Sequence, residues 1–126
     1  MKAPELPTVL RELRFPASAT LAPQPSRNLQ KANSLYLTLP NGVTVSIIWG
    51  PATYTDNYDA MDTYSGGGDI GAFWNKPRDS TTAELAIWDK DESWITHEFT
   101  GELGDMVIGY ADAETVQRVI DWAVAR

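Results

Sequence analysis

The sequence predicts an α+β domain: an antiparallel sheet of four to five strands with a C-terminal helix packed on one face. Two runs of alternating apolar residues flank Asn41-Gly42 and predict a β-hairpin. A second alternating region, residues 83–97, predicts another hairpin. Apolar residues at helical spacing near the C-terminus predict the amphipathic helix. We assign residues 1–33 to an N-terminal arm and residues 34–126 to a single domain.

Length and composition agree with one folded domain. The chain has 126 residues, of which 43% are hydrophobic, and a chain of this length can bury roughly two thirds of its unfolded surface. It contains no cysteine, so disulfides, thiolate nucleophiles and cysteine zinc sites are excluded. No run of ~18 apolar residues predicts a membrane span, and the first residues lack the apolar core of a signal peptide. These features favour a cytoplasmic protein.

The arm fits more than one local structure. Pro7 suits the first position of a short helix, which Pro16 would end. One face of this helix would carry Val9, Leu10 and Leu13. A strand over residues 13–21 is the alternative, and residues 21–26 predict an extended linker. The arm would either lie over the domain or act as a docking segment.

Residues 34–49 give the strongest structural signal. Leucines alternate with polar residues on one side of Asn41-Gly42, and valine and isoleucine alternate with Thr44 and Ser46 on the other. Asn and Gly tolerate the positive φ that hairpin turns require. Ile48 interrupts the polar face, which predicts that this face is partly covered as well.

The long connection over residues 50–82 is rich in Gly, Tyr, Asp and Thr. Connections of this length are usually functional or partly structured, and a short strand is expected near residues 70–74. In the hairpin that follows, Leu85 and Ile87 alternate with polar and small residues, a charged turn covers 89–92, and residues 93–97 form the return strand. Met106 to Ile108 form a short apolar run.

The C-terminal helix has a cap and a buried stripe. Asp112 is the expected N-cap and Glu114 lies favourably in the first turn. Residues on the opposite side, Arg118, Asp121 and Arg126, should face water. The buried stripe is expected to contain Val116, Val119, Ile120, Ala123 and Val124.

The candidate binding surface lies in the middle of the chain, where aromatic residues are mixed with carboxylates. Aromatic side chains beside carboxylates suit docking on a positively charged protein. Trp74 is the tryptophan expected to be exposed, whereas those at 49, 88, 94 and 122 are expected in the core or on a sheet face. The predicted partner-binding residues are Tyr54, Asp56, Tyr58, Asp59, Asp62, Tyr64, Asp69, Trp74, Asp89, Asp91 and Glu92.

The charge of the chain points away from nucleic acid. Its net charge is −7, and nucleic-acid binding is driven by Lys and Arg displacing counterions from phosphates. We therefore expect a host protein with a basic surface as partner, no direct nucleic-acid contact and no membrane. The sequence also allows a homo-oligomer.

No catalytic motif is evident, and we expect neither enzymatic activity nor a cofactor. His97 is the only histidine, and on a strand it would point away from Glu98, so it is interpreted as structural. Asp56, Asp59 and Asp62 recur every three residues without the spacing of an EF-hand loop, which favours a solvated acidic loop over a metal site. The glycines at 66–68 lack the Lys-Ser/Thr of a phosphate-binding loop.

The order of these segments resembles small acidic proteins encoded by phages and prophages, whose function is uncharacterised. The resemblance covers residues 38–125 and rests on the segments 40–46, 49–51, 82–88 and 107–110. It implies a phage accessory protein that acts in the host cytoplasm. Such a protein would bind and inhibit a basic nucleic-acid-binding defence factor, for example a CRISPR effector. A virion or assembly component, and a carboxylate- or metal-dependent hydrolase, are the alternatives.

Overall fold

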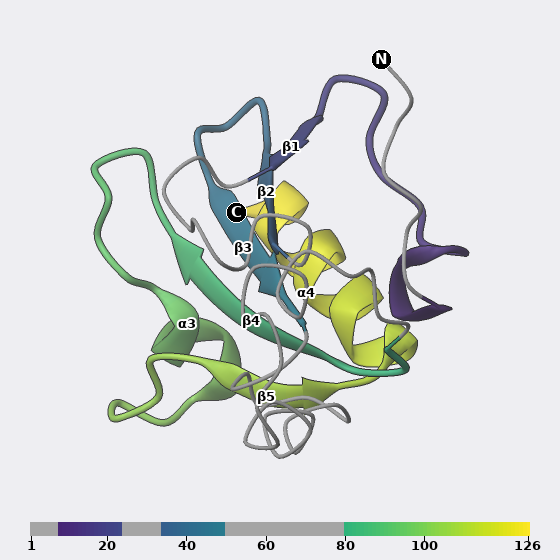
Figure 1. The fold of residues 1–126 in the computed structure, drawn as a ribbon. Helices are drawn as coiled ribbons and strands as arrows, with labels where there is room; N and C mark the ends of the chain where they lie inside the picture. Colours follow the sequence, from purple (N-terminus) through teal and green to yellow (C-terminus); the bar gives the residue numbers. More distant parts are fainter. Residues whose placement is uncertain (1–7, 24–33, 50–79) are drawn as a thin grey trace, which may run out of the picture.

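In the part of the chain that the structure describes, five antiparallel strands form one sheet whose spatial order follows the chain, β1-β2-β3-β4-β5 (Figure 1). The computed structural model describes residues 8–23, 34–49 and 80–126. The strands are β1 (Thr20–Pro23), β2 (Ser34–Thr38), β3 (Thr44–Ile48), β4 (Ala83–Trp88) and β5 (Ile108–Ala111). The helical elements are η1 (Thr8–Leu10), α3 (Thr96–Thr100) and α4 (Ala113–Ala125). The predicted α+β fold with a C-terminal helix is confirmed.

The hairpin β2–β3 forms where the alternation predicts it, with Leu37 opposite Val45. In its turn the Gly42 N–H donates to the Leu39 carbonyl at 2.9 Å, and the Leu39 N–H donates to the Val43 carbonyl at 2.9 Å. Gly42 has φ +88°, the left-handed region in which glycine carries no Cβ penalty. The positive φ therefore falls on Gly42 alone, and Asn41 uses its side chain instead.

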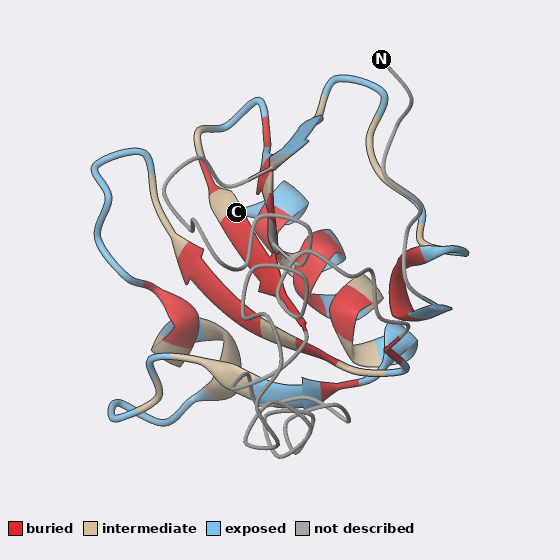
Figure 2. Cartoon of the chain, viewed as in Figure 1, coloured by how far each residue is buried: buried red, intermediate tan, exposed pale blue. Residues whose placement is uncertain are grey.

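One face of the sheet and α4 enclose the hydrophobic core (Figure 2). Strand periodicity sends alternate side chains to this face, where α4 lays its apolar stripe across them. Val124 was expected in the stripe but is 44% exposed, so the buried stripe ends at Ala123. The central core residues are Leu35, Leu37, Val45, Ile47, Leu85, Ile87, Val116, Val119, Ile120 and Ala123.

The N-terminal segment is part of this core and this sheet. Val9 and Leu10 of η1 are fully buried, so the expected short helix is present as a 3-10 turn. Residues 21–23, expected in an extended linker, instead lie in β1, because they find a pairing partner along β2. The rest of that linker, residues 50–79 of the long connection and its expected strand lie outside the described residues.

Gln117 of α4 holds the same segment by its main chain. Its Oε1 accepts from the Arg14 N–H at 2.8 Å, and its Nε2 donates to the Arg14 carbonyl at 3.1 Å. One half-buried helix residue thus satisfies both backbone groups of a residue 103 positions earlier.

The second hairpin differs from the prediction after its turn. β4 is present, but the return strand is wrong: Trp94 forms a single bridge with Trp88, and the chain then enters α3. The Ile95 N–H donates to the Ile87 carbonyl at 2.8 Å, and the Ile87 N–H donates to the Thr96 hydroxyl at 3.0 Å. Because Thr96 satisfies the next strand donor with its side chain, the backbone is free to turn into a helix.

The ends of the elements follow from caps. Asp112 is the N-cap of α4, as predicted, and its carboxylate accepts from the Thr115 N–H at 2.9 Å. Gly101 ends α3 with φ +83°. The apolar run before Gly109 continues into β5, which extends through Tyr110 to Ala111.

Candidate functional site

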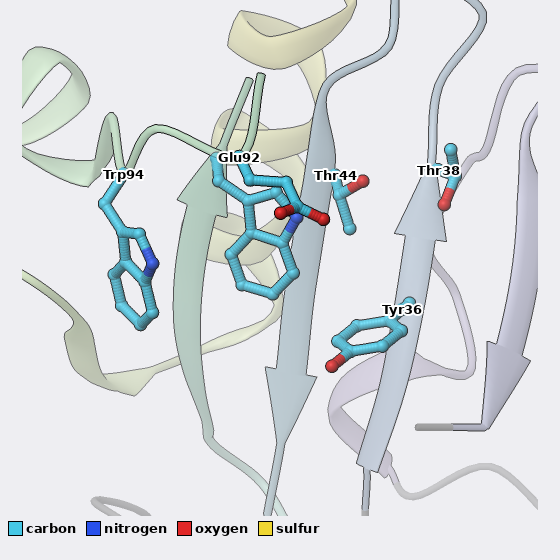
Figure 3. A pocket seen from close by; sticks show the side chains of 6 residues that line it. Tyr36, Thr38, Thr44, Glu92 and Trp94 are labelled. Atoms are coloured by element: carbon cyan, nitrogen blue, oxygen red, sulfur yellow. The ribbon is translucent and has the colours of Figure 1, made fainter. Parts of the chain in front are cut away.

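An open groove lies on the face of the sheet opposite α4 (Figure 3). Its volume is about 390 Å³. The described residues that line this aromatic groove are Tyr36, Thr38, Thr44, Trp88, Glu92 and Trp94. Three of them are aromatic, two are threonines and one carries a carboxylate.

Strand register builds the floor of the groove. Thr44 on β3 is directly opposite Thr38 on β2 and opposite Trp88 on β4, and Trp88 is in turn opposite Trp94. Residues that oppose each other in antiparallel pairs point to the same face. The four side chains therefore form one row across the sheet.

Tyr36 lies two residues before Thr38 on β2, on the same face of the sheet, and completes the aromatic set. Its ring meets the Trp88 ring edge to face, with centroids 5.5 Å apart and planes at 81°. The Trp88 and Trp94 rings are 5.6 Å apart and tilted by 37°. β3 lies between Tyr36 on β2 and Trp88 on β4. There it carries the small side chains of Thr44 and Ser46, which leave the hollow.

The face of the sheet that carries the groove is not uniformly open. Ser46, Ile48 and Ala86 lie on it and are buried, with 7%, 8% and 6% exposure. This confirms that the polar face is partly covered. Trp94, in contrast, is 44% exposed, so the groove opens to solvent at its Trp94 end.

The charged turn after β4 places Glu92 over the groove. The Glu92 N–H donates to the Asp89 carbonyl at 3.0 Å, and the Asp89 N–H donates to the Ser93 carbonyl at 2.9 Å. This repeats the pattern of the turn at Leu39–Val43. Glu92 has φ +64° and so occupies the position that glycine holds in the first turn. Figure 3 shows its side chain extending toward the Thr44 side of the groove.

The other two predicted carboxylates of this turn have different surroundings. Asp89 holds the turn together, because its Oδ1 accepts from the N–H groups of Asp91 and Ser93 at 2.9 and 3.0 Å. Asp91 lines a separate hollow of about 240 Å³, together with Lys90 and Arg126. Glu92 is therefore the predicted binding residue that the structure brings into the aromatic groove.

The remaining predicted partner-binding residues lie outside the described residues. They are Tyr54, Asp56, Tyr58, Asp59, Asp62, Tyr64, Asp69 and Trp74. The same holds for the glycines at 66–68.

Sequence reasoning missed the aromatic half of the groove. Trp88 and Trp94 were expected in the core or on a sheet face without a binding role, and Tyr36 was not singled out. The available signal was the alternation itself. Tyr36 and Trp88 are sequence neighbours of the buried Leu37 and Ile87, so they point to the other face of the sheet.

His97 lies in the short helix α3, so its expected position on a strand opposite to Glu98 is wrong. It is half-buried, and its carbonyl accepts from the Gly101 N–H at 2.8 Å, which closes the helix. Across residues 8–23, 34–49 and 80–126, no group of three or more His, Asp or Glu side chains is arranged to hold a metal ion. In the same ranges no helix has the length and apolar character needed to cross a membrane.

Comparison with known protein families, with curated proteins and with solved structures gives no match.

Proposed function

We propose that this is a non-enzymatic binding protein whose aromatic groove docks on a basic surface of another protein. One observation carries the proposal: Tyr36, Trp88 and Trp94 form a continuous aromatic surface that opens to solvent. Glu92 adds a carboxylate to it.

The chemistry of this surface favours a protein partner. Tryptophan and tyrosine are enriched among the residues that dominate binding energy in protein interfaces. Ring contacts restrict the three side chains, which lowers the conformational entropy lost when a partner covers them. The Thr38 and Thr44 hydroxyls supply hydrogen-bonding groups beside them.

Charge selects the kind of partner. The chain has a net charge of −7, and the turn beside the groove carries Asp89, Asp91 and Glu92 against the single cation Lys90. Such a field accelerates encounter with a basic surface and makes association sensitive to salt. Aromatic platforms also stack nucleic-acid bases, but here the carboxylates would repel the phosphates.

A nucleic-acid-binding protein has the required basic surface. Occupation of that surface would exclude its nucleic acid, which is the inhibitory action that the resemblance to phage proteins implies. We propose a bacterial defence factor of this kind as the partner, with action in the host cytoplasm.

Affinity capture from bacterial lysate at low and high salt, followed by titration with the purified captured protein, tests the proposal. Trp94→Ala should weaken binding by about tenfold or more, since it removes an exposed aromatic anchor. Leu103→Ala is the matched control, because Leu103 is 90% exposed and does not line the groove. Equal affinity of wild type and Trp94→Ala would rule out the groove as the docking surface.

A further inference from the structure

We infer that the aromatic groove receives an arginine side chain of the partner, stacked on Trp94 and paired with Glu92. This inference rests on the proposed function and names the group that the site recognises.

The protein itself contains the arrangement that we infer. Arg126 lies over the Trp122 ring, with its Cζ 5.8 Å from the ring centroid. Its Nη1 donates to the Glu98 Oε1 at 2.7 Å. Tryptophan and glutamate together thus hold one guanidinium, by a cation–π contact and a charge-assisted hydrogen bond.

The groove offers the same two groups, and its described lining holds no cation. Trp94 presents an indole that is 44% exposed, and Glu92 lines the same hollow. Among the described residues that line the groove, none is basic. The carboxylate and the aromatic surface are therefore complementary to a cation.

The backbone at Glu92 supports a binding role for this side chain. A left-handed conformation is strained for a residue with a Cβ but not for glycine, and the equivalent position of the first turn is Gly42. Strained positions of this kind cluster at binding sites, where the side chain is needed in that place. The strain at Glu92 aims a carboxylate at the groove.

Arginine fits better than lysine. A planar guanidinium can stack on an indole and still direct paired N–H groups at a carboxylate, whereas an ammonium is a compact, strongly hydrated charge. The volume of the groove, about 390 Å³, lies within the range of pockets that bind small ligands, so it can accept one side chain.

The test uses the full chain and short capped Gly/Ser peptides with one central residue: arginine, lysine or citrulline, the uncharged isostere of arginine. Binding is followed by the NMR shifts of the Trp88 and Trp94 indole N–H groups. The arginine peptide should shift both and bind more tightly than the lysine peptide, while the citrulline peptide should not bind. The inference would be overturned if the lysine or the citrulline peptide bound the protein as tightly as the arginine peptide.

Two variants of the same turn identify the carboxylate. Glu92→Gln should weaken arginine binding by about tenfold or more, as expected for a hydrogen bond between charged groups. Asp91→Asn removes the same charge from the neighbouring residue and should change affinity by less than about twofold. Equal weakening by both variants would show that only net charge matters, and the inference would fail.

The two proposals fail in different ways. Loss of partner binding in Trp94→Ala, with no response to the arginine peptide, would leave the docking surface in place and reject its arginine ligand. Unchanged partner binding in Trp94→Ala would reject both.

Discussion

The Asn41 side chain in the first hairpin turn donates from Nδ2 to the Ala123 carbonyl in the last turn of α4, at 2.8 Å. The same amide accepts from the Val43 N–H through Oδ1 at 3.1 Å. The last carbonyls of a helix have no partner within the helix. One side chain therefore fixes the shape of the turn, satisfies a helix end and joins the two layers of the fold.

Asn41→Ala removes both hydrogen bonds and should lower the free energy of unfolding by about 1–2 kcal/mol, measured by urea unfolding. Asn41→Asp separates the two bonds, because it keeps the acceptor for Val43 and loses the donor to Ala123. It also places a negative charge at the carbonyl end of α4, where the helix dipole is unfavourable to it. Wild-type stability in Asn41→Asp would contradict a contribution from the bond to Ala123.

Three glycines separate backbone conformation from steric contact. Gly42 has φ +88°, and a Cβ placed there would lie 2.6 Å from the Lys90 Cβ. Gly101 has φ +83° with open space around it, and Gly104 has neither constraint. Replacement by alanine should leave Gly104 nearly unaffected, cost about 1 kcal/mol at Gly101 and cost more at Gly42. Thermal unfolding of the three variants would contradict this if Gly42→Ala were no worse than Gly101→Ala.

The turn at Asp89–Ser93 has the same hydrogen bonds as the turn at Leu39–Val43, so we expect the opposite effect when its left-handed residue, Glu92, is replaced by glycine. Glu92→Gly relieves the left-handed strain and should stabilise the protein by up to about 1 kcal/mol, while it removes the carboxylate from the groove. A rise in the unfolding midpoint combined with weaker binding is the expected pair of results. Asp91→Gly is the control, because Asp91 does not adopt a positive φ and its replacement by glycine should destabilise the turn. A lower midpoint in Glu92→Gly would show that the left-handed conformation carries no strain.

The parts of the fold that could be predicted are those set by local pattern. Alternation fixed which residues of β2 and β3 face the core, and the N-cap chemistry of Asp112 located the start of α4. The turn into α3, where a return strand was expected, could not be predicted, because it depends on the Thr96 hydroxyl reaching the Ile87 N–H. That contact replaces a main-chain bond with a side-chain bond, and residue types alone do not distinguish the two.

The groove shows the same division. The turn carboxylates were predicted from composition, but their separation into Glu92 in the groove and Asp91 outside it depends on how the turn is folded. The Tyr36–Trp88 contact requires the order β2-β3-β4, since both rings reach across the small side chains of β3. This neighbourhood is a product of the sheet and is visible only once the strands are paired.

Thr96 should be replaceable by serine but not by valine. Thr96 is fully buried, and its hydroxyl accepts the Ile87 N–H in the interior. Thr96→Val keeps the shape of the side chain but leaves this N–H without its acceptor, which should cost about 1–3 kcal/mol. Thr96→Ser keeps the hydroxyl and loses one methyl, so it should cost about 1 kcal/mol. Urea unfolding would contradict the role of the hydroxyl if valine were tolerated as well as serine.

The stabilisation of α4 by Asp112 should vary with pH in the acid range. Hydrogen bonds from the Thr115 main chain and side chain hold the pKa of the Asp112 carboxyl below its ordinary value of 3.8. Since the folded-state pKa is the lower one, the charged cap stabilises the fold fully above the unfolded-state pKa, and this contribution disappears as the pH falls through the folded-state pKa.

Asp112→Asn keeps a neutral oxygen acceptor for Thr115 but cannot ionise, so it isolates the charge. The advantage of the wild type over Asp112→Asn in urea unfolding should be constant from neutral pH to about pH 5 and shrink at lower pH. Asp112→Ala, which lacks the acceptor, should be the least stable of the three at neutral pH. An advantage over Asp112→Asn that persists undiminished at about pH 2 would mean that the carboxylate charge does not stabilise the start of α4.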